Sequence, residues 1–373
     1  MSQALVSAEP SAICSLRPGK SNGVVSIENA TSISLNSVEA NHSKRILELD
    51  GLRAFAILSV FVYHVWSVPL SWMGVDLFFV LSGFLITGIL LGRKSRPGYF
   101  RGFYTRRARR ILAPYYLLLV LSSVLFGTVW LKQWYWYAFF ASNIPNALHS
   151  VPHESLDVLW SLAVEEQFYL LWPVAILFLP ETALVWTAML LIALAPVLRG
   201  IATSFVSTSA PIYHLMPFRM DLLAAGALTA LLWRRSPGII RRMPLLGPTL
   251  VACAAVVLFC LSRFEWFRTG GNIQFNNVVL FSLTLVVAVG LLLWSLQENG
   301  LFPAILRLRA LRFFGANQLL DVPCPRKLYP FSAAAVFKSV GCVRYGFRSN
   351  GCIQHGLLVC LGEPPYTEEN CHS

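Results

Sequence analysis

Charged residues are scarce in this chain. Asp, Glu, Lys and Arg together make up 13% of its 373 residues, whereas soluble domains usually carry about 25%. Hydrophobic residues reach 56%, and the mean hydropathy is +0.60. The scarcity of charge excludes an ordinary soluble domain and predicts an all-α, multi-pass bundle of transmembrane helices.

Two further absences narrow the class of protein. The eight cysteines show neither CxxC nor metal-ligand spacing, so we expect no metal site and no bound cofactor. The net charge is +12, but no basic patch interleaved with aromatic residues stands outside the expected loops, and we expect no nucleic-acid partner. The first 45 residues are polar and lack an apolar signal-peptide core, which predicts a disordered cytoplasmic tail.

Eight apolar stretches are predicted to cross the membrane, most of them long enough for about 30 Å of hydrocarbon. They are residues 51–70, 74–92, 111–130, 158–179, 182–198, 211–233, 244–262 and 275–296. Lys and Arg gather in three connections, 93–110, 234–242 and 307–312. All three fall on one side if the amino terminus is cytoplasmic, which the positive-inside rule favours. We therefore expect a protein of the cell inner (plasma) membrane.

The first span carries Arg53 near one end and His64 near the other. Eleven positions on a helix place both side chains on one face, about 16 Å apart along the axis. Arg53 could simply anchor the cytoplasmic end, and His64 could hydrogen-bond a neighbouring helix. Histidine is also the side chain best suited to accept and return a proton near neutral pH, so His64 is a candidate general base.

The fourth span contains two adjacent glutamates, Glu165 and Glu166, which point about 100° apart on a helix. A carboxylate inside an apolar run must be paired, protonated or directed into a wet cavity. A purely structural pair between helices is the alternative. Ser161 and Tyr169 lie four residues on either side of Glu165, on the same face.

Other intramembrane polar residues have more than one explanation. In the second span, Gly74, Ser82, Gly83 and Gly88 predict close helix packing, and Asp76 lies near the outer interface. In the sixth span, Arg219 and Asp221 are expected to pair across helices. In the basic segment, Arg106 and Arg109 could set topology and attract anionic lipids, or bind the phosphates of a cytosolic ligand.

Five segments in order resemble the membrane acyltransferase-3 family, a family of integral-membrane O-acyltransferases. They are "LDGLRAFAILSVFVYH", "GVDLFFVLSGFLIT", "FYTRRARRILAPYY", "LWSLAVEEQFYLLWP" and "FRMDLLAAGAL". The resemblance covers residues 45–315. It implies a bundle of ten helices that passes an acyl group, commonly acetyl, from cytosolic acyl-CoA to a hydroxyl of an envelope carbohydrate or related acceptor.

The resemblance also implies roles for individual residues. Arg53 and His64 correspond to the key arginine and histidine of the family's first helix. Glu165, or else Glu166, corresponds to its glutamate after the WSL sequence. Arg106 and Arg109 match its arginines after the second helix, where CoA phosphates would bind.

After Gly315 the sequence departs from the family. No apolar run long enough to span a membrane follows, and the segment is rich in cysteine and proline. We expect a membrane domain over 46–315 that lacks its last two helices, followed by an unrelated tail, 316–373, that is disordered or derives from a shifted reading frame. Two alternatives to an active enzyme are a proton-coupled transporter or channel and an inactive, truncated family member.

Overall fold

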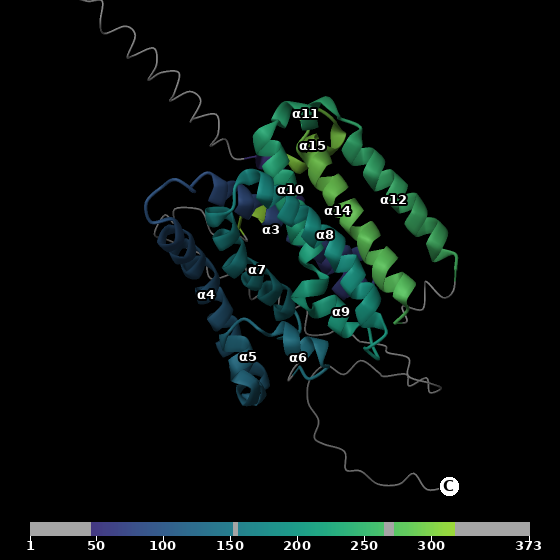
Figure 1. Cartoon of the computed structure of the whole chain (residues 1–373). Coiled ribbons are helices and arrows are strands. Elements are labelled where there is room, and N and C mark those ends of the chain that lie inside the picture. Colours follow the sequence, from purple (N-terminus) through teal and green to yellow (C-terminus); the bar gives the residue numbers. More distant parts are fainter. Residues whose placement is uncertain (1–45, 152–155, 265–271, 318–373) are drawn as a thin grey trace, which may run out of the picture. The chain divides into compact units, whose positions relative to one another are not determined.

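The computed structural model describes residues 46–151, 156–264 and 272–317, and Figure 1 shows their arrangement. The chain divides into two units, Met1–Leu47 and Glu48–Ser373, and nearly all described residues belong to the second unit. The predicted tails, 1–45 and 316–373, lie outside the described residues except for Ala316 and Asn317, which end the last helix.

The described residues are helical and contain no strand, as predicted for an all-α protein. The longer helices are α2 (Leu47–Trp66), α3 (Gly74–Leu91), α4 (Tyr99–Phe126), α7 (Leu159–Phe178), α8 (Glu181–Thr203), α10 (Met220–Arg235), α12 (Leu246–Ser262) and α14 (Phe281–Ser295). The shorter ones are η1 (Ser71–Met73), η2 (Val129–Gln133), α5 (Trp134–Ala138), α6 (Asn143–Ala147), α9 (Ala210–His214), η4 (Met216–Phe218), α11 (Pro237–Arg242), the π-helical η5 (Asn276–Leu280), α15 (Leu301–Leu306) and α16 (Arg309–Asn317).

Among the described residues, six helical segments are long and apolar enough to cross a membrane. They are Leu47–Trp66, Ser71–Leu91, Tyr99–Leu125, Leu159–Phe178, Glu181–Thr203 and Asn276–Ser295. The predicted spans at 211–233 and 244–262 form shorter helices instead. The first is interrupted because Leu215 is extended and a separate turn, Met216–Phe218, contains Pro217, so that α10 has only 16 residues. The second, α12, has 17 residues.

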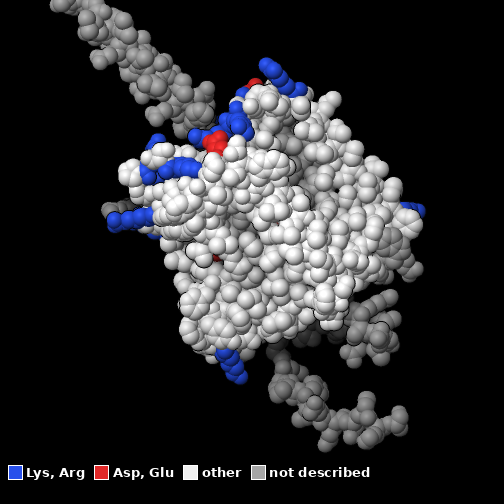
Figure 2. Space-filling view, viewed as in Figure 1, with Lys and Arg blue, Asp and Glu red and all other residues white. Residues whose placement is uncertain are grey.

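From Tyr99 onward the basic segment is helical rather than a loop. Gly98 takes a left-handed conformation, with φ of 70°, and α4 then runs unbroken from Tyr99 through the basic segment into the predicted third span. The arginines between 101 and 110 therefore have fixed helical spacing. On the face shown in Figure 2, Lys and Arg gather at the upper end of the molecule, where Figure 1 places α11 and α15.

The centre of the fold is α3, which packs most extensively on α10 and also contacts α14 and α7. Glycine makes the first contact possible: a Cβ at Gly83 would lie 2.0 Å from the Leu223 carbonyl oxygen, and one at Gly226 would lie 2.0 Å from the Val80 carbonyl oxygen. The predicted close packing is confirmed at Gly83. It is wrong for Gly88, where an added Cβ would meet nothing within 4 Å.

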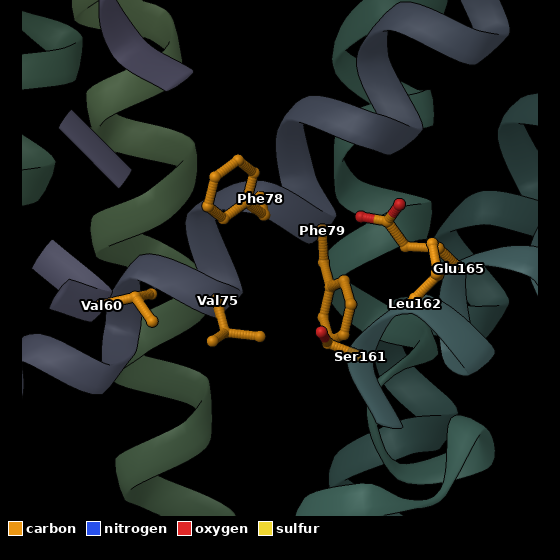
Figure 3. Close-up of a pocket in the computed structure, with 7 residues that line it drawn as sticks. All are labelled: Val60, Val75, Phe78, Phe79, Ser161, Leu162 and Glu165. Carbon is orange, nitrogen blue, oxygen red and sulfur yellow. The ribbon is translucent and has the colours of Figure 1, made fainter. Parts of the chain in front are cut away.

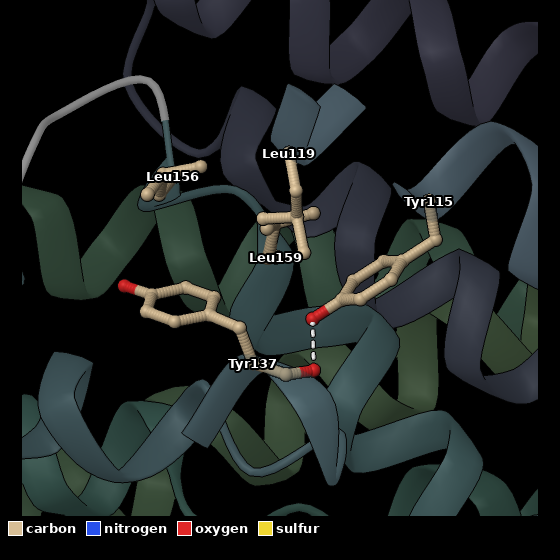
Figure 4. Packing of buried hydrophobic residues seen from close by; sticks show 5 residues of the cluster. All are labelled: Tyr115, Leu119, Tyr137, Leu156 and Leu159. Carbon is tan, nitrogen blue, oxygen red and sulfur yellow. Dashed lines mark hydrogen bonds between the residues drawn. The ribbon is translucent and has the colours of Figure 1, made fainter. Parts of the chain in front are cut away.

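A second, smaller core joins α4 and α7 to the short helix α5 (Figure 4). Its buried residues are Tyr115, Leu119, Tyr137, Leu156 and Leu159. The Tyr115 hydroxyl donates a hydrogen bond of 2.8 Å to the Tyr137 carbonyl oxygen. This core holds the segment between α4 and α7 against the end of the bundle where α7 begins, close to the pocket described next.

Candidate active site

A pocket of about 230 Å³ lies between α2, α3 and α7 (Figure 3). Its lining residues are Val60 of α2, Val75, Phe78 and Phe79 of α3, and Ser161, Leu162 and Glu165 of α7. Glu165 is the one charged residue among them. The pocket therefore combines a mainly apolar wall with one carboxyl group.

Glu165 is held by two hydroxyl groups. Ser82 of α3 donates to its Oε1 at 2.8 Å, and Tyr169, one turn further along α7, donates to its Oε2 at 3.1 Å. Tyr169 and Ser161 thus do share the face of Glu165, as their spacing predicts. Two donors fix the orientation of the carboxyl group at the pocket wall and satisfy an acceptor that would be costly to leave unpaired in the membrane.

Glu166 lies in a different environment, as expected for an adjacent helical position. Its Oε1 is 3.7 Å from Nη1 of Arg107 on α4. The same guanidinium lies over the ring of Tyr169, with Cζ 3.6 Å from the ring centroid. Arg107 therefore joins the basic segment to the glutamate pair, a link that sequence analysis missed because it counted Arg107 only among the residues that set topology.

His64 lies on α2, one turn beyond the pocket residue Val60. Its Nδ1 is 2.8 Å from the Val60 carbonyl oxygen. A carbonyl oxygen can only accept, so in neutral His64 the proton is on Nδ1 and Nε2 is the acceptor. This is the tautomer that a general base requires.

The three predicted arginines do not line the pocket. Arg53 is on α2, three turns from His64, and its Nη1 lies 3.3 Å from Asp50 Oδ1. Arg106 and Arg109 are exposed on α4, and Arg106 turns back over Gly102. The structure therefore brings Glu165 and the turn before His64 to one pocket and places the predicted phosphate-binding arginines elsewhere.

Two fully buried ion pairs lie behind the pocket. Arg219, at the start of α10, pairs with Asp76 of α3, whose Oδ2 also accepts a hydrogen bond of 2.6 Å from Thr284 of α14. Arg199 of α8 pairs with Asp221 of α10 at 2.8 Å. Arg219 and Asp221 therefore both form ion pairs across helices, as expected. Arg219 pairs with Asp76 and Asp221 pairs with Arg199. In the described part of the chain, no cluster of His, Cys, Asp and Glu is placed to hold a metal ion.

These features define an all-α, multi-pass membrane protein with a small apolar pocket that presents a carboxyl group between its helices. Residues 46–319 match the acyltransferase domain family, and the chain belongs to this family.

Several bacterial proteins are similar to the chain. It is 31% identical over 280 residues to YrhL of Bacillus subtilis, named as a peptidoglycan O-acetyltransferase, with 64% of this chain and 43% of that protein covered. It is 39% identical over 153 residues to the peptidoglycan O-acetyltransferase OatA of Listeria monocytogenes, covering 36% and 24%. It is 27% identical over 315 residues to the O-acetyltransferase OatA of Staphylococcus aureus, covering 74% and 50%. The chain thus spans half or less of these relatives' length. No solved structure matches it.

Proposed function

We propose that this protein is a membrane O-acyltransferase that moves an acyl group from cytosolic acyl-CoA to a hydroxyl of an envelope carbohydrate. Peptidoglycan is the acceptor that the names of its relatives favour. The observation that carries the proposal is the position of His64: its Nδ1 lies 2.8 Å from the Val60 carbonyl oxygen, and the Val60 side chain lines the pocket that contains Glu165. An imidazole one helical turn from this pocket is suited to act as the general base of acyl transfer.

In the proposed reaction, Nε2 of His64 removes the proton from the acceptor hydroxyl. The hydroxyl oxygen then attacks the thioester carbonyl carbon, the new C–O bond forms, and the C–S bond breaks. The imidazolium returns its proton to the departing CoA thiolate. Glu165, fixed by Ser82 and Tyr169, presents its carboxyl group at the pocket wall, where it is suited to orient the acceptor by hydrogen bonding.

The basic residues support binding of the donor. CoA carries phosphates, and guanidinium groups suit phosphate oxygens. Arg106 and Arg109 are exposed on the first turns of α4 and Arg53 is near the start of α2, all at helix ends that the positive-inside rule assigns to the cytoplasm. We propose that these ends receive acyl-CoA, while the end of α2 that carries His64 faces the acceptor.

The experiment is an acetyl-transfer assay in membranes that contain the full chain, with radiolabelled acetyl-CoA and soluble peptidoglycan fragments. His64→Ala and His64→Gln should lower the rate by about 10² to 10⁴, the usual contribution of a general base. Phe55→Ala is the matched control, because Phe55 is on the same helix and 43% exposed. Full activity of both His64 variants would contradict the assignment of the base, and no transfer by the unaltered protein would contradict the function.

A further inference from the structure

The wall of the pocket is unsuited to a sugar ring or a phosphate. Apart from Ser161 and Glu165, its lining consists of Val, Phe and Leu side chains. The hydroxyls of a carbohydrate would lose their hydrogen bonds to water against such a wall, which is costly. A hydrocarbon chain would gain by burial there, by about fourfold in binding for each methylene. The chemistry of the lining therefore selects an aliphatic group.

The size of the pocket exceeds what an acetyl group needs. A water molecule occupies about 30 Å³ in the liquid, so the volume of about 230 Å³ corresponds to several groups of methylene size. An acetyl group adds only one methyl carbon beyond the carbonyl. Most of the apolar wall would then have no contact with the bound acyl group, and a chain of several carbons would fill the space better.

The position of the pocket relates it to His64. Val60 contributes its side chain to the lining and its carbonyl oxygen to Nδ1 of His64. An acyl chain with its tail between Val60 and Val75 would lie one helical turn from His64 on α2. Figure 3 shows Val60 and Val75 on one side of the pocket and Phe79 and Glu165 on the other.

We propose that this pocket is the acyl subsite of the enzyme, that it admits acyl groups longer than acetyl, and that Val75 limits the chain length. The inference rests on the proposed acyl transfer and deepens it. Val75 is suited to this role because it is half-buried on the first turn of α3, and a larger side chain there would extend into the pocket. Phe78 fills the neighbouring part of the wall, so its truncation should lengthen the chain that is accepted.

The test uses membranes with the full chain, soluble peptidoglycan fragments as acceptor, and acetyl-, butyryl- and hexanoyl-CoA as donors. We expect kcat/KM for butyryl-CoA within tenfold of that for acetyl-CoA. Val75→Phe should lower the butyryl-to-acetyl ratio at least tenfold, and Phe78→Ala should raise the hexanoyl-to-acetyl ratio. Ile89→Phe is the matched control, because Ile89 is on the same helix and 48% exposed, and its ratios should equal those of the unaltered protein.

Each remaining outcome is decisive. If the unaltered protein uses acetyl-CoA and rejects butyryl-CoA, or if Val75→Phe lowers both rates equally, the acyl subsite is elsewhere and the inference is overturned while the proposed function stands. If no donor is used, the proposed function itself is overturned. Val75→Leu should narrow the pocket less than Val75→Phe and replaces it if Val75→Phe does not fold. It should lower the hexanoyl-to-acetyl ratio more than the butyryl-to-acetyl ratio.

Discussion

The guanidinium of Arg107 lies over the ring of Tyr169, with Cζ 3.6 Å from the ring centroid, and the hydroxyl of the same tyrosine donates to Glu165 at 3.1 Å. A charged side chain from α4 thus supports the tyrosine that orients the pocket carboxyl group. Glu166, on the same helix as Tyr169, lies 3.7 Å from Arg107 Nη1 and also holds the guanidinium. Glu165 therefore lines the pocket itself, whereas Glu166 contacts Arg107, which supports Tyr169.

Replacing Arg107 should impair catalysis by releasing Tyr169. Arg107→Lys keeps the charge but loses the planar group that stacks on the ring, and we expect a loss in kcat on the order of 10- to 100-fold, the scale of a small misplacement at a reacting centre. Arg101→Lys is the control, since Arg101 is exposed on the same helix. Equal rates for Arg107→Lys and Arg101→Lys would show that the stacking has no role.

Replacing Glu165 by glutamine should remove the charge and keep the shape. The Ser82 and Tyr169 hydroxyls can still bond to an amide, so folding should survive, while transfer should fall about 100-fold because the amide changes the hydrogen bonds that would orient the acceptor. Glu181→Gln, at the exposed start of α8, should keep full activity. The assay is acetyl transfer, with gel filtration to confirm folding, and retention of activity by Glu165→Gln would exclude Glu165 from the reaction.

The helical period explains which parts of the site were predictable. Spacing alone placed Tyr169 and Ser161 beside Glu165 and turned Glu166 away, because the positions of neighbours on one helix follow from 3.6 residues per turn. The period cannot show which side of α4 faces α7. Arg106, Arg107 and Arg109 look alike in sequence, yet Arg107 is the one that reaches Tyr169, and only the packing of two helices distant in sequence decides this.

The sequence likewise predicted the class of the fold but not all of its helix boundaries. Hydropathy located the segments and the all-α class, since backbone groups in lipid must be satisfied within helices. It placed the start of the third span at residue 111, because hydropathy falls in the basic segment although the helix begins at Tyr99. It also merged α9 and α10 into one span, although the helix is interrupted between them at Leu215 and the turn that contains Pro217.

The buried pair of Asp76 and Arg219 should be critical for stability. Both side chains are fully buried, and removing one partner of such a pair leaves an uncompensated charge, at a cost of about 3–5 kcal/mol. Asp76→Ala should therefore lower the thermal midpoint in detergent strongly. The double variant Asp76→Ala/Arg219→Met should recover part of the loss, because neither residue then leaves an unpaired buried charge.

An exposed pair provides the control for that measurement. Arg241 and Glu298 lie 2.6 Å apart with side chains 47% and 62% exposed, and such pairs contribute about 0–1 kcal/mol. Glu298→Ala should therefore shift the midpoint little. A similar shift for Asp76→Ala and Glu298→Ala would mean that the Asp76 pair is hydrated or unformed in the protein.

His214 should make stability depend on pH. Burial of this α9 side chain lowers its pKa to about 4, and the charges of Arg219 and His149 act in the same direction. In the unfolded chain a histidine pKa is about 6.5, so between these two values the unfolded state binds a proton that the folded state does not. Stability therefore falls as the pH decreases from about 6.5 to about 4, by up to about 3 kcal/mol.

The measurement is the thermal midpoint in detergent across that pH window for the unaltered protein and for His214→Gln, which cannot titrate. The difference in stability between the two should shrink, or change sign, as the pH falls. Tyr213→Phe is the matched control, because it alters the neighbouring position of α9 without removing a group that titrates in this range. The ring centroid of Trp160 lies 4.9 Å from that of His214, and burial is the largest cause of the lowered pKa. A difference between the unaltered protein and His214→Gln that stays constant from pH 7 to pH 4 would therefore show that His214 is solvated in the folded protein.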